Sequence, residues 1–314
     1  MKLRRVTKRH PCEVCGKQTW CGYSEDGSVA VCMRVESDKP TKNRGWLHVL
    51  KETNAPRRQA PPQPDLHSHP LASREHIDAI YSTLVIGHLV LSEEHRAKLE
   101  SRGFTPDRVR SNCYRSVPTE LFGANVARAL SQYNLRGVPG FYRERGAWKM
   151  VTPGPGILIP VRDSRGRIRG FQVRRDEGSP RYLWFSSASK PEGQSSGAPV
   201  HFAHPERIKR QGRVYVTEGA LKADVIAARL DCAAIGIPGV TTWPRGFGRN
   251  LKKLFPSLSD LRLCFDSDFK TNDNVRRALF GLLAELRGAL YSPAVLTWDG
   301  QFKGFDDFLT RRAA

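Results

Sequence analysis

The stretch Val214-Tyr215-Val216-Thr217-Glu218-Gly219 decides the fold of this chain of 314 residues, because it joins an apolar strand to a carboxylate and a glycine. The glycine allows a sharp turn into the helix that we expect at residues 221–230. In open α/β sheets, ligands bind at the carboxyl ends of the strands. Glu218 is therefore predicted to face a ligand site.

A second strand of the same kind follows at Leu261-Arg262-Leu263-Cys264-Phe265 and ends in Asp266-Ser267-Asp268. In an extended strand, Asp266 and Asp268 point to the same face, and a neighbouring strand can bring Glu218 to them. A divalent cation, Mg²⁺ or Mn²⁺, would remove the repulsion among the three acids and activate an attacking hydroxyl. The alternative is a solvated loop at residues 266–268 and a helix cap at Glu218. The two motifs in this order favour the metal site.

The segment after residue 206 alternates strands with helices, which predicts an α/β fold with a parallel sheet flanked by helices. The expected strands and helices cover residues 214–217, 221–230, 233–235, 261–265, 272–290, 294–297 and 305–312. Upstream, apolar residues at helical spacing begin after Ser73, and residues 156–161 and 167–173 predict two strands joined by a turn. We therefore expect an α+β subdomain at residues 73–205, followed by the sheet domain at residues 206–314.

Four cysteines near the N-terminus have a spacing typical of zinc ligands. Cys12 and Cys15 are separated by two residues, and Cys21 and Cys32 follow within a span that short strands can fold back, so four thiolates can hold tetrahedral Zn²⁺. Because Cys21 and Cys32 do not form a closely spaced pair, His10 is an alternative to Cys21 as the fourth ligand. Cysteines packed without metal are the weaker interpretation, since so small a segment has little apolar core of its own.

A proline-rich stretch, residues 54–64, follows the cysteines and lacks apolar periodicity, which favours an extended linker. The sequence thus predicts a zinc-binding module at residues 1–51 and a linker at residues 52–72.

The formal net charge of +20 favours a polyanionic partner, because cationic side chains on phosphates release condensed counterions. Basic solubilising surface and attraction to anionic lipid are the alternatives. Lipid is the weaker one, since the chain has no apolar run of about 18 residues. The basic start is not followed by a signal-peptide core, so we expect a cytoplasmic protein with reduced cysteines and no membrane partner.

The order strand-Glu-Gly-helix, then strand-Asp-x-Asp, resembles the Toprim fold that bacterial-type primases, topoisomerases and certain nucleases share. Residues 156–173, Pro180-Arg181-Tyr182-Leu183 and Arg102-Gly103-Phe104 are similar to the core of bacterial replicative primases. The heptapeptide at residues 218–224 is also similar to small phage- and plasmid-borne Toprim proteins. The resemblance implies a Toprim-type parallel sheet flanked by helices, preceded by a primase-core α+β subdomain and a small N-terminal zinc ribbon.

The same resemblance implies a DNA primase, which synthesises short RNA primers on single-stranded DNA from nucleoside triphosphates during phage or plasmid DNA replication. Its catalytic and magnesium-binding residues would be Glu218, Asp266 and Asp268. In the later acidic pair Asp306-Asp307, Asp306 would be a further magnesium ligand, and capping of the last helix is the alternative for each of the two. Mg²⁺ or Mn²⁺ would be the catalytic cofactor and Zn²⁺ a structural one. The chain has no P-loop, so any helicase partner is expected to be a separate polypeptide.

Basic side chains near these acids would contact phosphates. Replicative primases usually have an aspartate at the position of Lys222, and this lysine either contacts a phosphate or neutralises the carboxylates. Lys270 is a second expected phosphate contact. The template would follow arginines that hold backbone without reading sequence: Arg162, Arg167, Arg169, Arg174, Arg175 and Arg181. A solvated surface role is the alternative for each of them, and their concentration in this segment favours a track.

Two other functions stay open. A Toprim nuclease would use the same carboxylates to hydrolyse phosphodiesters, although the primase-like strands before Glu218 argue against it. A non-catalytic DNA-binding protein would retain the fold for recruitment, and Lys222 is the feature that supports this interpretation. A topoisomerase is disfavoured, because Tyr215 and Tyr291 lie in core-like contexts.

Overall fold

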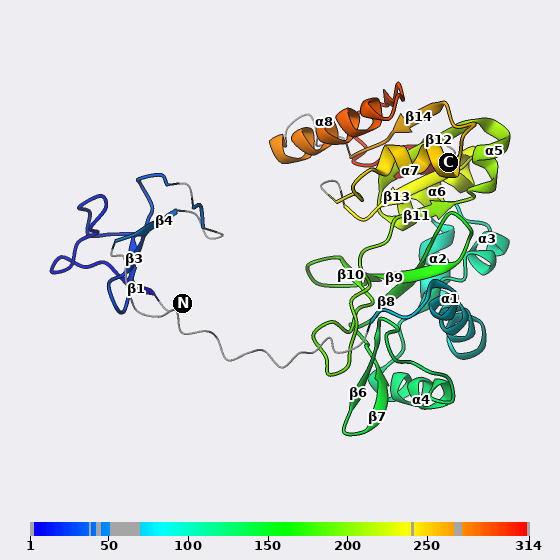
Figure 1. Ribbon diagram of the computed structural model, residues 1–314, viewed down its shortest axis with the longest axis horizontal. Coiled ribbons are helices and arrows are strands. Elements are labelled where there is room, and N and C mark those ends of the chain that lie inside the picture. Colours follow the sequence, from blue (N-terminus) through cyan, green and yellow to red (C-terminus); the bar gives the residue numbers. More distant parts are fainter. Residues whose placement is uncertain are drawn as a thin grey trace. The chain divides into compact units, whose positions relative to one another are not determined.

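The computed structural model divides the chain into two compact units, Met1–Gln63 and Pro64–Ala314, and each unit is described by itself (Figure 1). The residues that the structure describes are 3–37, 39–41, 45–50, 70–239, 242–266 and 272–312. Asp268, Lys270 and most of the predicted linker, residues 51–69, lie outside these ranges. Within these ranges, no helix has both the length and the apolar character that crossing a bilayer requires.

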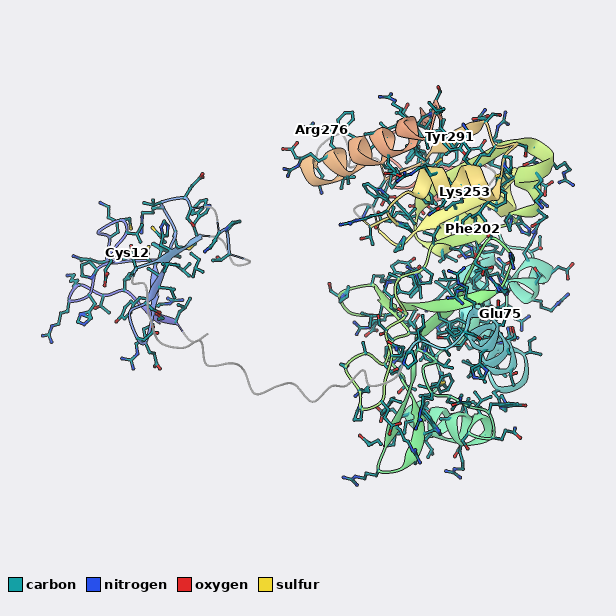
Figure 2. All side chains as sticks on the ribbon, in the orientation of Figure 1. Cys12, Glu75, Phe202, Lys253, Arg276 and Tyr291 are labelled. Atoms are coloured by element: carbon teal, nitrogen blue, oxygen red, sulfur yellow. The ribbon has the colours of Figure 1, made fainter. Side chains whose placement is uncertain are left out.

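The first unit is an antiparallel sheet with the strand order β1-β2-β3-β4. These strands span Leu3–Arg5, Gly22–Ser24, Val29–Cys32 and Trp46–Val49. Cys32 at the end of β3 is fully buried and packs with Val6, Cys12 and Cys21. Figure 2 labels Cys12 among the side chains of this unit. Cysteines thus make up most of this small interior, as expected for a module that needs a metal ion to stabilise its fold.

The second unit begins with helices that start at local capping signals. Ser73, Ser92, Thr105 and Thr119 each accept a hydrogen bond from the backbone N–H three residues further on. The helices α1 to α4 and the π-helical turn η1 span Arg74–Thr83, Glu93–Glu100, Pro106–Ser111, Glu120–Leu130 and Leu84–His88. The apolar residues that we expected at helical spacing after Ser73 are all buried: Ile77, Ile80, Tyr81, Leu84 and Val85.

An antiparallel sheet with the order β10-β9-β8-β5 follows, and it contains the predicted pair of strands. β8 and β9 are paired from Gly156, which lies opposite Arg175, to Arg162, which lies opposite Ile168. The turn at residues 163–167 joins the two strands. β5, β8, β9 and β10 span Arg115–Ser116, Gly156–Arg162, Ile168–Arg175 and Tyr182–Trp184, and a separate hairpin joins β6 (Phe141–Glu144) to β7 (Ala147–Met150). Phe171 of β9 packs against Tyr81 of α1, with ring centroids 4.7 Å apart, which holds the helices on this sheet.

The remaining strands form a five-stranded sheet with the order β11-β13-β12-β14-β15. Strand pairing is parallel except at the edge, where β11 runs antiparallel to β13. The strands β11 to β15 span His201–Ala203, Arg213–Glu218, Ala234–Ile237, Asp260–Leu263 and Ala294–Val295. The helices α5 to α9 span Glu206–Gln211, Ala220–Leu230, Phe247–Leu254, Asp273–Gly288 and Phe305–Arg312. Because β11 precedes residue 206, this sheet draws strands from both sides of the domain boundary predicted there.

Helices cover both faces of the five-stranded sheet (Figure 1). Val214 and Val216 of β12 pack with Leu251 of α7 and Leu282 of α8, whereas Tyr215 points to the other face. There it meets the side chains of α6 and α9, including Ile226, Ala227 and Phe305. Side chains of β12 thus alternate between the two helical layers, and Glu218 follows at the carboxyl end of this strand.

A buried polar network fixes α6. Asp224 accepts hydrogen bonds from the Tyr114 hydroxyl at 2.6 Å and from His201 Nε2 at 3.0 Å, and all three side chains are buried. His201 Nδ1 accepts from the backbone N–H of Arg162 at 3.0 Å, so the ring proton lies on Nε2 and points at Asp224. The network thereby ties α6 to β8, β11 and the segment before β5.

Candidate active site

Two strand ends and one helix start bring three carboxylates to the same cleft. β12 ends at Glu218, and Gly219, with φ +81°, turns the chain into α6. β14 is the parallel neighbour of β12 and ends at Leu263, so Asp266 lies beyond it at the same edge of the sheet. Asp306 lies in the first turn of α9. The cleft measures about 680 Å³ and is lined by Arg102, Gln172, Arg174, Arg181, Tyr182, Glu218, Gly219, Leu221, Lys222, Pro238, Asp266, Lys303, Gly304, Asp306 and Asp307.

Gln172 of β9 holds the start of α6 against the other sheet. Its side chain is almost fully buried, and its Oε1 accepts a hydrogen bond from the backbone N–H of Ala220 at 3.3 Å. Without a polar side chain at the N-cap position, α6 relies on this contact for one of its free N–H groups. The first turn of α6, which contains Lys222, is therefore positioned by both sheets.

Lys222 lies in the first turn of α6 and forms an ion pair with Asp266. Burial opposes its charge, but the attraction of Asp266, Asp306 and Glu218 outweighs burial and raises the pKa of Lys222. Lys303 approaches the other carboxylate oxygen of Asp266 at 3.9 Å, with a side chain that is 73% exposed. The ion pair neutralises Asp266, and a contact between Lys222 and a phosphate stays a prediction.

Asp306 is only 2% exposed, and its two carboxylate oxygens differ. Oδ2 accepts a hydrogen bond from the Arg102 guanidinium at 3.2 Å, whereas Oδ1 is buried and has no hydrogen-bond partner among the described residues. Burial raises the pKa of Asp306, and Asp307 and Asp266 add to this rise, while Lys222 and Arg102 oppose it. A buried oxygen without a partner is a position where a cation is missing or a proton resides.

Gly304 lies beside both Asp266 and Asp306. A Cβ atom on this glycine would lie 2.3 Å from Asp306 Oδ1 and 3.4 Å from Asp266 Oδ1, so any side chain would collide with the Asp306 carboxylate. Carboxylate oxygens are the ligands that Mg²⁺ and Mn²⁺ prefer. The unpaired Asp306 oxygen beside the Asp266 carboxylate fits a hard divalent cation, although within the described ranges only the cysteines bring three or more ligand atoms within 4.8 Å.

Arginines form the cationic wall of the same cleft. Arg174 and Arg181 line it beside Arg102, and within the described ranges neither Arg174 nor Arg181 forms an ion pair with a carboxylate. Burial lowers the pKa of Arg174, and the neighbouring Arg102 and Arg181 lower it further. Arg174 is half-buried and Arg181 is exposed, and neighbouring guanidinium groups that repel one another are expected to bind an anion such as phosphate.

The other four arginines of the predicted track lie elsewhere. The Arg162 guanidinium donates to the backbone carbonyls of Gly166 and Asn112, and Arg167 pairs with Asp163 and Glu75. Burial lowers the pKa of Arg169, and Arg175 donates to the Pro180 carbonyl at 3.5 Å. The structure thus brings Arg174 and Arg181 to the carboxylates, and a continuous track through all six arginines stays a prediction.

The four predicted cysteine ligands lie together in the first unit. The Sγ atoms of Cys12, Cys15, Cys21 and Cys32 lie within 4.8 Å of one another, a cluster that can hold a metal ion. The Arg34 guanidinium donates to Cys21 Sγ at 3.6 Å and to the Thr19 carbonyl at 2.8 Å. This cation offsets the charge that clustered thiolates would carry. The set fits tetrahedral Zn²⁺, which takes four sulfur ligands.

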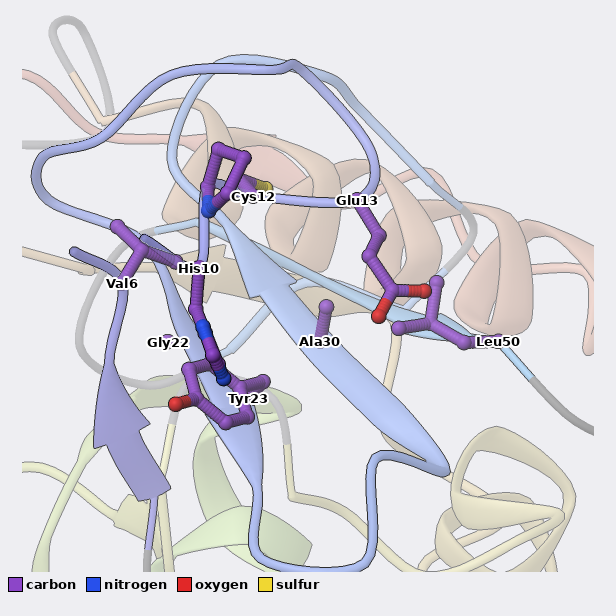
Figure 3. Close-up of a pocket in the computed structure, with 9 residues that line it drawn as sticks. Val6, His10, Cys12, Glu13, Gly22, Tyr23, Ala30 and Leu50 are labelled. Atoms are coloured by element: carbon purple, nitrogen blue, oxygen red, sulfur yellow. The ribbon is translucent and has the colours of Figure 1, made fainter. Parts of the chain in front are cut away.

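His10 does not belong to the cysteine cluster, so Cys21 is the fourth sulfur of the set. The His10 ring lies beside the Tyr23 ring, with centroids 6.4 Å apart, in a pocket of about 230 Å³ next to Cys12 (Figure 3). Trp20, immediately before Cys21, is 81% exposed. Aromatic rings beside the cluster are therefore available to a ligand.

Sequence reasoning missed three contributors to the cleft. Arg102 pairs with Asp306 across 204 positions of sequence, and Lys303 and Gln172 reach Asp266 and α6 from other segments. The segment Arg102-Gly103-Phe104 was singled out only for its family resemblance. No local pattern indicates such pairs, because each depends on the packing of α9 and β9 against distant elements.

Comparison with known proteins confirms the resemblance at the level of the fold. A family model for a domain of unknown function, DUF3854, matches residues 208–314, and no curated protein matches the chain. The chain is similar to the crystal structure of the zinc-binding and RNA polymerase domains of Aquifex aeolicus primase, with a TM-score of 0.59 and 17% identity, over 77% of this chain and 59% of that one. This chain thus spans less than two thirds of that structure.

Two further similar structures are primase cores. One is a DnaG primase catalytic domain bound to single-stranded DNA, with a TM-score of 0.57 and 17% identity over 76% of this chain and 75% of that one. The other is the RNA polymerase domain of Mycobacterium tuberculosis primase, with a TM-score of 0.56 and 16% identity over 76% and 82%. The chain therefore has a mixed α/β fold similar to bacterial primase catalytic cores.

Proposed function

We propose that this protein is a DNA primase-like nucleotidyltransferase that synthesises short RNA primers on single-stranded DNA. The observation that carries the proposal is the cleft, where Glu218, Asp266 and Asp306 share one cavity with Arg174 and Arg181. Carboxylates suited to a divalent cation and arginines suited to phosphates are the two requirements of nucleotidyl transfer. The similar fold of a primase catalytic domain bound to single-stranded DNA supports this assignment.

In this proposal, the carboxylates supply the metal site. Glu218, Asp266 and Asp306, with Asp268 beyond the described residues, would hold Mg²⁺ or Mn²⁺. When bound, such a cation polarises phosphate oxygens and promotes ionisation of the attacking hydroxyl. Glu218 at the end of β12 acts as a ligand or as the base that accepts the proton of the initiating 3′-hydroxyl.

The basic side chains orient the nucleotide and the template. Arg174 and Arg181 bind the phosphates of an incoming nucleoside triphosphate, because they line the cleft without a carboxylate partner among the described residues. Lys222 and Lys270 are further phosphate contacts. Template DNA follows arginines of β8 and β9, including Arg162, Arg167, Arg169 and Arg175, whose charge holds backbone without reading sequence.

We assign the parts of the chain accordingly. Residues 1–51 are the zinc-binding ribbon, 52–72 the linker, 73–205 the first subdomain of the primase core and 206–314 a Toprim-type domain. Zn²⁺ on the four cysteines stabilises the ribbon, and the exposed Trp20 with Tyr23 stacks on bases of the template to select the start site. Replication of phage or plasmid DNA, with a separate helicase, is the proposed context.

Primer synthesis on unprimed single-stranded DNA tests the proposal. The assay supplies labelled ribonucleotides with Mg²⁺ or Mn²⁺ and compares the wild type with Asp266→Asn and Glu218→Gln. Glu206→Gln is the matched control, since this exposed carboxylate lies on α5, outside the cleft. Short labelled products that disappear in both cleft variants and persist in the control support a primase.

The other outcomes identify the competing functions. Cleavage of the template that depends on Asp266 would indicate a metal-dependent nuclease. DNA binding without products, unchanged by either cleft variant, would indicate a non-catalytic replication protein, because the carboxylates would then have no chemical role.

A further inference from the structure

One positively charged side chain of the cleft, Lys222, is paired with a carboxylate of the same cleft. The Lys222 side chain is 24% exposed, and its ammonium group bonds directly to Asp266 Oδ1. That same oxygen lies next to Gly304, and so does the unpaired Oδ1 of Asp306. The lysine thus holds one of the two carboxylate oxygens that meet beside this glycine.

A charge count over the described residues shows that this acidic site is not negative overall. Four carboxylates line the cleft, namely Glu218, Asp266, Asp306 and Asp307. Five cationic side chains line it as well: Arg102, Arg174, Arg181, Lys222 and Lys303. Two divalent cations would therefore enter a site that is already balanced, and their mutual repulsion would have little to offset it.

We propose that Lys222 is a resident cation that replaces one divalent ion, so that the carboxylate cluster binds a single Mg²⁺ or Mn²⁺. The ion binds at the unpaired oxygen of Asp306, while the Lys222 ammonium supplies the second positive charge toward the phosphates of the nucleotide. This inference deepens the proposed function and rests on it for the identity of the substrate. Its metal stoichiometry is measured without substrate.

Lys303 does not play this role, although it also approaches Asp266. Its side chain is 73% exposed and its Nζ lies 3.9 Å from Asp266 Oδ2, so water and salt screen the interaction. Lys222 is in direct contact and enclosed by α6 and the cleft. The two lysines have the same charge and approach the same carboxylate, but only Lys222 is enclosed. Lys303 therefore serves as the matched control for Lys222.

Mn²⁺ binding to the full-length, zinc-loaded protein tests the inference. The free Mn²⁺ signal in electron paramagnetic resonance gives the number and affinity of bound ions, and Asp306→Asn identifies the ions that belong to the cluster. We expect one cluster ion in the wild type. In Lys222→Met we expect a second ion, or about tenfold tighter binding, because one unit charge a few ångströms away has been removed. In Lys303→Met the change should stay within about twofold.

A charge-conserving variant keeps the test decisive if Lys222→Met fails to fold. Lys222→Arg retains the cation and should bind one ion, like the wild type, whereas Lys222→Gln should behave like Lys222→Met. The melting temperature of Lys222→Gln should also rise more on adding Mn²⁺ than that of the wild type, because the ion replaces the lost ammonium.

Two results would overturn the inference. Two cluster ions in the wild type, or the same number and affinity in the wild type and in Lys222→Gln, would show that the lysine does not stand in for a metal ion. Failure of primer synthesis with the expected Mn²⁺ stoichiometry would instead reject the primase function and leave the single-ion site in place.

Discussion

The cysteine cluster and the carboxylate cleft assemble their charged groups in opposite ways. All four sulfurs come from one short segment, Cys12 to Cys32, and together they make up most of the interior of their unit. The cleft draws on β9, β12, α6, α9 and the loop after β14, and its acids are already paired with Lys222 and Arg102. The cysteine cluster can hold a metal ion and has few other buried side chains around it, whereas protein cations already neutralise carboxylates of the cleft.

This contrast predicts that metal removal has its largest effect on the first unit. Structural zinc in small modules contributes on the order of 10 kcal/mol, and the first unit has almost no other core. Chelation, or Cys32→Ser, should therefore unfold residues 3–50 and leave the second unit folded. Amide spectra of the full-length, isotope-labelled protein measure this, with Cys113→Ser as a control outside the cluster. Dispersed signals from the first unit in the zinc-free protein would contradict the prediction.

The second-largest predicted effect is a difference in activity between variants of two adjacent carboxylates of the cleft, Asp306 and Asp307. Asp306 is buried with an unpaired oxygen, while Asp307 is exposed on the same turn of α9. We expect Asp306→Asn to lower the rate of primer synthesis on the order of 10²-fold, as for loss of one group that stabilises developing charge, and Asp307→Asn to lower it only a few-fold. Equal losses in the two variants would show that the unpaired oxygen has no special role.

The same contrast explains what the sequence could predict. Cysteine spacing, the capping residues Ser73 and Ser92, and the strand that ends at Glu218 are local signals, and the corresponding structures lie where they were expected. The parallel sheet follows from alternating strands and helices, since each crossover needs a helix.

What could not be predicted depends on distant packing. Arg102 and Asp306 pair across most of the second unit, and nothing near either residue indicates the partner. The antiparallel edge strand β11 was missed, because its three residues have no pattern of their own. The arginines of β8 and β9 look alike in sequence, yet only Arg174 and Arg181 reach the cleft, because strand alternation and the β9–β10 turn set their directions.

The buried network on α6 tests whether distant packing also positions the cleft. Asp224→Asn places an amide N–H against the donors Tyr114 or His201, and we expect a loss of about 2 kcal/mol in the free energy of unfolding. Asp231→Asn at the end of the same helix is the matched control. It removes the ion pairs that this carboxylate, 73% exposed, forms with Arg207 and Arg108, and should change stability by less than about 0.5 kcal/mol. Urea unfolding, monitored by far-ultraviolet circular dichroism, reports on the helices of the second unit. Equal unfolding midpoints for Asp224→Asn and Asp231→Asn would contradict the prediction.

The smallest expected effect distinguishes Arg174, which lies in β9, from Arg167, which lies in the turn before this strand. Arg174 lines the cleft without a carboxylate partner in the described part of the chain, whereas Arg167 pairs with Asp163 and Glu75 outside it. Arg174→Ala should raise the KM for nucleoside triphosphate about tenfold, because it removes a charge-assisted contact to phosphate of roughly 1.4 kcal/mol. Arg167→Ala should leave this KM unchanged when template DNA is saturating, since Arg167 is a proposed template contact whose two partners lie outside the cleft. Steady-state primer synthesis over a range of nucleotide concentrations separates the two, and a rise in KM for Arg167→Ala alone would move the nucleotide out of the cleft and onto the outer surface of β8 and β9.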